Sequence, residues 1–157
     1  MSDIHDFNRT LIAEFRATGG KMDSPSAQKL FAPFRPDRAE TDGQSDELRL
    51  LLLTTIGAKS GLPRTNPVDY TTDGDSIVII ASYAGAARHP DWYYNLLANP
   101  IVTVEKGSER FQARAVIVSG QERERLYAQM AKQIPLFAED QRKTSRQIPV
   151  VLVQRVE

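Results

Sequence analysis

The stretch LLLLTTIGAKSGLPRTNPVDY, residues 50–70, holds two strand-like segments joined by an unusual loop. An apolar run, Leu50–Leu53, leads into two threonines, and a second strand-like segment begins at Thr65. The loop between them carries two glycines and two cations, Lys59 and Arg64. Because a plain hairpin needs only a short turn, this loop predicts a site for something negatively charged.

The loop has the parts that an anion site needs. Gly57 and Gly61 permit backbone conformations in which several N–H groups converge on one point. Arginine grips a phosphate or carboxylate through two N–H groups, lysine adds a point charge, and Ser60 adds a hydroxyl donor. The alternative is a solvated hairpin loop whose charges only aid solubility.

Length and composition indicate one globular domain. The chain has 157 residues, of which 41% are hydrophobic and 25% charged, and its net charge of zero disfavours general nucleic-acid binding. The lack of cysteine excludes disulfides and thiol chemistry, and His5 and His89 lie too far apart to suggest a metal cluster. Because we see no signal peptide and no long apolar run, we expect a cytoplasmic protein.

The rest of the chain alternates helix-like and strand-like segments. Within residues 1–20, one apolar face over 5–17 predicts a helix packed on the sheet; a membrane-surface or partner helix is the alternative. Residues 21–47 are rich in Pro, Asp and Ser and predict a long loop, either mobile or a lid over a site. Further helices are expected at 91–98, at 121–132 and after Pro135, and strands at 48–55, 65–72, 76–82, 101–106, 110–118 and 148–153.

This order of segments predicts the fold class. Hairpin-like connections between most strands favour a mainly β protein with peripheral helices (α+β), organised as a small β-barrel over residues 1–157. Neither a G-x-G-x-x-G motif after a strand nor a G-x-x-x-x-G-K-[ST] motif is present, so the sequence gives no support to a Rossmann or P-loop nucleotide site.

A second unusual stretch, ASYAGAARHPDWYYNLLANP, covers residues 81–100. Its small residues would let a flat ring approach the backbone of a strand end. We interpret Trp92 as a core anchor of the following helix, and we expect Asn95 to tie that helix to a neighbouring loop. His89 is interpreted as a structural hydrogen-bonding residue, with a catalytic base as the alternative.

Five blocks in this order resemble the deazaflavin (coenzyme F-420)-dependent nitroreductase family: LLLTTIGAKSGLPRTNPVDY, DGDSIVIIASYAG, RHPDWYYNLLANPIVTVE, RFQARA and QRKTSRQIPVVLV. The first helix with its Gly19–Gly20 pair is also similar. The resemblance implies a split β-barrel like that of the flavin-binding pyridoxamine-oxidase group. It also implies coenzyme F-420, a deazaflavin with an anionic phosphate and an oligoglutamate tail.

The resemblance also implies roles for individual residues. Ser82 and Tyr83 match positions that meet the deazaflavin and are the candidate catalytic residues, Ser82 as a hydrogen bonder and Tyr83 as a proton donor. Ile134, Phe137 and Asp140 match positions that line the substrate side, with Asp140 either selecting the acceptor or facing water. The implied cofactor-binding residues are Lys59, Ser60 and Arg64 at the phosphate and tail, Thr65 and Pro67 beside the ring, Ser82 and Tyr83, and Trp92 and Asn95 below the pocket.

Two departures from the family pattern refine the expected function. Ala58 replaces an arginine found in many relatives, which predicts weaker binding of the tail by about 1–3 kcal/mol. The substrate-side positions carry no tyrosine, which disfavours nitroimidazole reduction. We therefore expect hydride transfer from reduced coenzyme F-420 to a quinone-like acceptor. The alternatives are an FMN-dependent reductase, a non-catalytic deazaflavin carrier and an interaction domain; a homodimer and a peripheral membrane contact also stay open.

Overall fold

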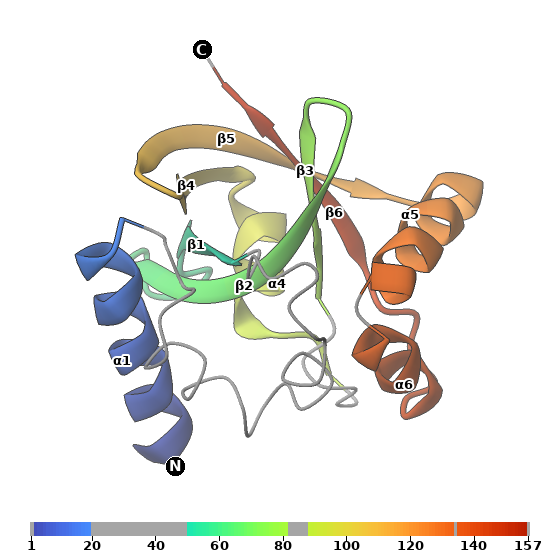
Figure 1. The fold of residues 1–157 in the computed structure, drawn as a ribbon, viewed down its shortest axis with the longest axis horizontal. Coiled ribbons are helices and arrows are strands. Elements are labelled where there is room, and N and C mark those ends of the chain that lie inside the picture. Colours follow the sequence, from blue (N-terminus) through green and yellow to red (C-terminus); the bar gives the residue numbers. More distant parts are fainter. Residues whose placement is uncertain (1, 20–49, 82–87, 134, 157) are drawn as a thin grey trace.

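The computed structural model describes residues 2–19, 50–81, 88–133 and 135–156. Six antiparallel strands form a closed barrel in the order β1-β2-β3-β6-β5-β4, which confirms the predicted fold class (Figure 1). The elements are α1 (Ser2–Ala17), β1 (Leu50–Ile56), β2 (Pro63–Asp73), β3 (Ser76–Ile80), α4 (Asp91–Ala98), β4 (Ile101–Lys106), β5 (Glu109–Val118), α5 (Gly120–Gln133), α6 (Leu136–Arg142) and β6 (Val150–Arg155).

Alternation along the strands fills the barrel. Leu51 and Leu53 point inward from β1, and the pairing of Leu53 with Val104 on β4 closes the sheet on itself. Trp92 and Leu96 of α4 belong to the same buried cluster. A second cluster forms on the outside of the sheet, where α5 and α6 cover Val78, Ile80 and Val150. Burial of apolar surface in these two clusters is the main term that stabilises the fold.

The expected segments are confirmed, with shifts at some ends. The helix at 91–98 has the predicted bounds, since it follows Pro90 and ends at Asn99. The sequence pattern predicts the last strand at 148–153, whereas β6 runs from Val150 to Arg155. The carbonyl and amide of Ile148 form hydrogen bonds with the side chains of Arg123 and Gln141 and not with a neighbouring strand. Pro149 has no N–H group and cannot donate a hydrogen bond to a neighbouring strand. The predicted loop at 21–47 lies outside the described residues.

The two ends of the barrel differ. At one end, two-residue turns join β2 to β3 and β4 to β5, and Gly74 and Gly107 adopt the positive φ that such turns require. At the other end β1, β3 and β5 finish and β2, β4 and β6 begin. The β1–β2 loop and the helices α4, α5 and α6 are all inserted between strands at this second end, which we call the helical end.

Helix α1 packs against the outside of the barrel beside β2 (Figure 1). Leu11 and Phe15 are fully buried, and Arg16 donates two hydrogen bonds, at 3.0 and 2.8 Å, to the carboxylate of Glu105 on β4. The predicted packing of this helix is therefore confirmed, and these two apolar side chains are not exposed to a membrane. None of the described helices is long and apolar enough to cross a membrane.

Candidate functional site

The loop between β1 and β2 folds into a compact turn. The amide of Gly57 donates to the carbonyl of Leu62 at 2.8 Å, and the amide of Gly61 donates to the carbonyl of Gly57 at 2.9 Å. The hydroxyl oxygen of Ser60 accepts from the amide of Leu62 at 3.1 Å. A Cβ atom at Gly57 would lie 2.5 Å from that hydroxyl oxygen, so the turn closes this tightly only around a glycine.

Both cations of this loop are exposed. Lys59 lies in the turn, and Arg64 is the second residue of β2. Among the residues that the structure describes, neither side chain has an ion-pair partner. A loop whose hydrogen bonds hold it closed thus presents two uncompensated positive charges at the helical end of the barrel. That arrangement suits an anion.

Helix α4 holds this loop through Asn95. The Asn95 side-chain oxygen accepts from the amide of Ala58 at 2.9 Å, and its nitrogen donates to the hydroxyl of Thr55 at 3.0 Å. Asn95 and Thr55 are both buried. The expectation that Asn95 ties the helix to a neighbouring loop is confirmed. Trp92, one turn earlier, is buried in the barrel core, as its interpretation as a core anchor predicted.

The predicted cofactor residues of β2 divide between two faces of the sheet. Arg64 pairs with Thr55 and lies in the inward-facing row, whereas Thr65 pairs with Thr54 on the opposite face, as does Pro67 with Leu52. The hydroxyl oxygens of Thr54 and Thr65 lie 2.8 Å apart. A ligand that contacts this whole set has to pass over the rim of the barrel.

A second polar cluster surrounds the end of β3, and sequence reasoning missed its central residue, Arg146. One guanidinium nitrogen of Arg146 donates to the carbonyl of Ala81 at 3.2 Å and lies 2.7 Å from Nδ1 of His89. The His89 ring is also in contact with Tyr93 and Tyr94, at centroid distances of 4.6 and 5.6 Å. These contacts support the interpretation of His89 as a structural hydrogen-bonding residue.

The electrostatics of this cluster follow from partial burial. Burial and the positive charge of Arg146 lower the pKa of His89, which favours the neutral imidazole. Burial also lowers the pKa of Arg146, but the charge of Asp140 acts in the opposite direction. Burial raises the pKa of Tyr93. The cluster therefore combines the cation of Arg146 with the neutral imidazole of His89 and the neutral phenol of Tyr93.

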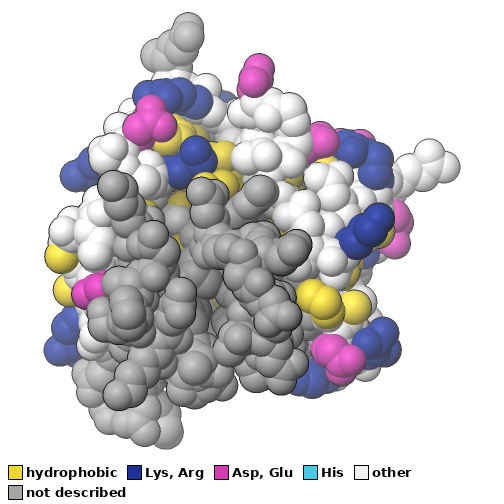
Figure 2. Space-filling model, viewed as in Figure 1, with side chains coloured by type: hydrophobic (Ala, Val, Ile, Leu, Met, Phe, Trp, Pro, Cys, Tyr) yellow, Lys and Arg dark blue, Asp and Glu magenta, His cyan; other side chains and the backbone are white. Residues whose placement is uncertain are grey.

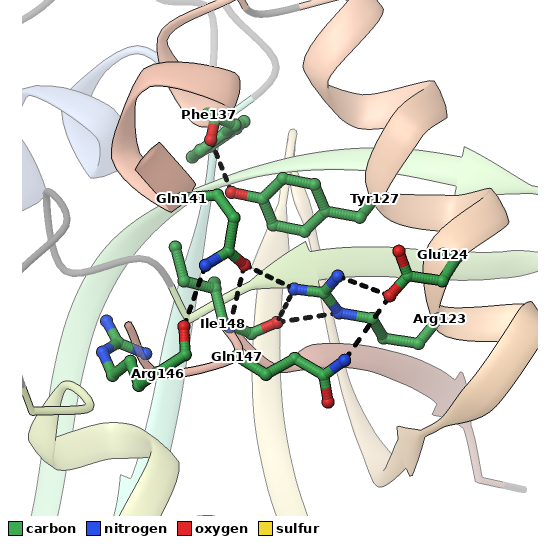
Figure 3. A network of polar contacts seen from close by, with 8 residues as sticks. All are labelled: Arg123, Glu124, Tyr127, Phe137, Gln141, Arg146, Gln147 and Ile148. Atoms are coloured by element: carbon green, nitrogen blue, oxygen red, sulfur yellow. Dashed lines mark hydrogen bonds and ion pairs between the residues drawn. The ribbon is translucent and has the colours of Figure 1, made fainter. Parts of the chain in front are cut away.

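A hydrogen-bond network carries Arg146 into position (Figure 3). The buried guanidinium of Arg123 on α5 donates to the carbonyl of Ile148, at 3.1 and 2.6 Å, and to the side-chain oxygen of Gln141 at 2.8 Å. Gln141 in turn donates to the carbonyl of Arg146 at 2.8 Å. The segment between α6 and β6 is thus held through its backbone, which explains its fixed course without regular structure.

The remaining predicted site residues are distributed as follows. Phe137 is buried in the second core cluster, where its described contacts are those of a core residue. Asp140 is only 2% exposed, so of its two alternatives the one that it faces water is wrong. The catalytic candidates Ser82 and Tyr83, and the substrate candidate Ile134, lie outside the described residues. Among those that are described, no group of histidines and carboxylates could hold a metal ion.

Basic and acidic side chains are interspersed over the described part of the face seen in Figure 2, in keeping with the zero net charge. The closed six-stranded barrel, with helices inserted at one end and an exposed cationic loop beside them, defines a split-barrel protein. The charge of that loop suits an anionic ligand.

The chain belongs to the F420H(2)-dependent quinone reductase family, whose profile matches residues 32–155. It is 40% identical over 110 residues to a protein of Mycobacterium tuberculosis named F420H(2)-dependent quinone reductase, covering 67% of this chain and 72% of the relative. A second M. tuberculosis protein, described as a putative F420H(2)-dependent quinone reductase, is 38% identical over 104 residues and covers 66% of this chain and 87% of the relative. The family match confirms the resemblance to deazaflavin-dependent reductases, although nitroreductase is absent from these names.

Solved structures agree with this assignment. A structure titled F420-H2 dependent reductase is 37% identical, with a TM-score of 0.62, and covers 68% of this chain and 94% of that one. Another, whose title describes a domain-swapped dimer, is 33% identical, with a TM-score of 0.63, and covers 83% of this chain and 100% of that one. A putative pyridoxamine 5'-phosphate oxidase of Listeria innocua, 13% identical with a TM-score of 0.50, shares only the fold; it covers 69% of this chain and 85% of that one.

Proposed function

We propose that this protein is an oxidoreductase that uses reduced coenzyme F420 to reduce a quinone. The observation that carries the proposal is the rigid cationic loop at the helical end of a barrel whose family is that of F420H(2)-dependent quinone reductases. Coenzyme F420 is the reductant named for the relatives, and its phosphate and oligoglutamate tail are the anions that such a loop suits.

Lys59 and Arg64 would hold the anionic end of the coenzyme, because both are exposed cations on a turn whose shape is fixed by its own hydrogen bonds. Ser60 already accepts a hydrogen bond through its oxygen, so its hydroxyl proton is left to donate to the ligand. Thr65 and Pro67 would border the ring from the outer face of β2. Ala58 leaves the loop one cation short of the pattern in many relatives.

The coenzyme supplies the hydride, and the protein supplies binding and orientation. The small residues that follow β3 would let the flat ring approach the chain, with Ser82 and Tyr83 as the proposed contacts. Asn95 acts indirectly, since its hydrogen bonds to Ala58 and Thr55 fix the position of the cationic loop relative to the barrel core. In this proposal Trp92 serves the site through packing.

Fluorescence titration of the purified protein with coenzyme F420 and with FMN tests the cofactor. We expect F420 to bind and FMN to bind far more weakly. Lys59→Ala should weaken F420 binding at least about tenfold, the worth of one charged contact. Lys132→Ala is the matched control, because Lys132 is an exposed lysine in the last turn of α5. An unchanged dissociation constant in Lys59→Ala would reject the assigned role.

Turnover separates the remaining alternatives. With a menaquinone analogue present, we expect F420H2 to be oxidised in proportion to quinone reduced. If F420H2 binds but is not oxidised, the protein is a deazaflavin carrier. If FMN binds more tightly than F420, it is a flavin reductase, and if neither binds, it is an interaction domain. A homodimer is also proposed, because a relative's solved structure is titled a domain-swapped dimer; light scattering measures the mass in solution.

A further inference from the structure

Arg146 connects two parts of the chain that lead into and out of the proposed coenzyme region. Its guanidinium nitrogen contacts the carbonyl of Ala81 directly after β3 and the imidazole of His89 just before α4. Ala81 is fully buried, and His89 and Arg146 are half-buried. The contact therefore lies where the barrel interior meets the surface at the helical end.

This contact determines which imidazole nitrogen carries the proton. A guanidinium group has only donors, so at 2.7 Å the Nδ1 atom of His89 has to accept. The proton of the neutral ring is then on Nε2, which becomes a hydrogen-bond donor. The groups around the ring are the cations Arg146 and Arg88, the phenols of Tyr93 and Tyr94, and Asp91, whose carboxylate pairs with Arg88 at 2.8 Å.

Arg146 is itself held from several sides. Its carbonyl accepts from Gln141 at 2.8 Å, and its amide donates to the hydroxyl of Thr144 at 3.3 Å. Gln141 is fixed by the buried Arg123, and the charge of Asp140 favours the protonated guanidinium. These hydrogen bonds fix the backbone of Arg146, so its side chain reaches His89 from a defined position.

We propose that Arg146 is a positioning residue for quinone reduction, and that it fixes His89 as the Nε2–H tautomer, which donates a hydrogen bond to a carbonyl oxygen of the acceptor. This inference rests on the proposed function. Hydride addition brings two electrons and one proton to the quinone and leaves negative charge on a carbonyl oxygen. The Nε2–H group stabilises that charge without giving up its proton, and a proton from water completes the hydroquinone.

Nuclear magnetic resonance of the imidazole nitrogens tests the first half of the proposal without the coenzyme. The chain has two histidines, so His5→Gln leaves only His89 to observe. In that background we expect the Nε2–H tautomer. Arg146→Met should yield a mixture of tautomers and a higher pKa for His89, whereas Arg142→Met, an exposed arginine of α6, should change neither. Identical His89 spectra in the two variants would overturn the inference.

Two substitutions of His89 test the second half. The amide nitrogen of glutamine can occupy the place of Nε2, whereas that of asparagine is closer to Nδ1. His89→Gln should therefore retain most of the turnover, and His89→Asn should lower kcat by about ten- to hundredfold, the worth of one hydrogen bond to a charged oxygen. Arg146→Lys, which keeps the charge, should recover part of the kcat lost in Arg146→Met. Equal kcat values for the two His89 variants would refute the donor role, whether or not the Arg146 variants fold.

The F420 dissociation constant separates the two levels of the argument. If the wild type fails to bind F420 or to reduce quinone, the proposed function fails. If it does both, and Arg146→Met keeps the wild-type dissociation constant and kcat, only the positioning role fails. Loss of kcat at an unchanged dissociation constant supports the inference, because a merely structural defect would weaken binding as well.

Discussion

Replacing Asn95 by alanine isolates the contact that joins α4 to the cationic loop. Asn95 accepts from the Ala58 amide at 2.9 Å and donates to the Thr55 hydroxyl at 3.0 Å, so Asn95→Ala removes both hydrogen bonds at once. The two partners are not equivalent. Ala58 is exposed and its amide can bond to water instead, whereas Thr55 has no exposed surface.

These environments set the expected loss of stability. The Ala58 hydrogen bond is worth about 1 kcal/mol, since water replaces it, and the buried Thr55 hydroxyl adds about 1–3 kcal/mol when it loses its partner. We therefore expect Asn95→Ala to lower the free energy of unfolding by about 2–4 kcal/mol. For a chain of this size each kcal/mol lowers Tm by about 2–4 °C. Binding of F420 should weaken as well, because the loop is no longer held in its binding conformation.

Urea denaturation of Asn95→Ala, Thr55→Val and the double variant measures the coupling. The double variant should cost less than the sum of the single ones, because Thr55→Val already removes one of the two contacts. Asn99→Ala is the matched control, since among the described residues that side chain accepts one long hydrogen bond, at 3.4 Å. If Asn95→Ala is as stable as the control, or if the single effects add without coupling, Asn95 does not hold the loop in place.

Three further predictions concern the loop, the second core cluster and α1. Gly57→Ala should weaken F420 binding, whereas Gly61→Ala should mainly lower stability, because of the two new Cβ atoms only that at Gly57 would collide with a neighbouring group. Fluorescence titration with F420 measures the first effect and urea denaturation the second. Tyr127→Phe should lower the free energy of unfolding by about 1–3 kcal/mol in thermal denaturation, because the buried hydroxyl donates to a carbonyl of α6. Burial raises the pKa of Tyr127 to about 12, so the same variant should lose the phenol titration at that pKa. Hydrogen bonds from Arg16 lower the pKa of Glu105, so the contact stabilises the folded state fully above pH 4.5 and this stabilisation is lost as pH falls through the lower folded pKa. Arg16→Met should therefore lower the free energy of unfolding by about 0.5–1 kcal/mol at pH 7 in urea denaturation and leave it unchanged at strongly acidic pH.

Much of the fold was predictable because its signals are local. Alternation over 101–106 and 110–118 identified β4 and β5, and Pro90 with Asn99 bounded α4 to the residue. The start of β6 could not be read in the same way. Ile148 is as apolar as a strand residue, but its backbone is bound by Arg123 and Gln141, which come from two other elements. No local pattern reports such a contact.

The site was predictable only in part, for the same reason. Two cations and two glycines within one short loop are visible in the sequence, and so is an asparagine on the next helix. Arg146 carries no such signal: its neighbourhood looks like a polar linker before the last strand, and its contacts with Ala81 and His89 join segments far apart in the chain. Counting strands would have helped, since the connections after β1, β3 and β5 in an antiparallel barrel meet at one end.

That counting rule also explains why the proposed chemistry belongs at one end of the molecule. The opposite end is closed by two-residue turns. Turns this short contribute few side chains that could converge on a ligand. At the helical end, the connections contribute the cationic loop, the start of α4 and the segment that carries Arg146. Lys59 and Arg146 lie on different connections at the same end of the barrel, and their roles should separate in experiment. The loss of Lys59 should act on coenzyme affinity, and the loss of Arg146 on turnover. If both substitutions changed affinity alone, the two clusters would form a single anion site, and Lys59 and Arg146 would not have separate roles.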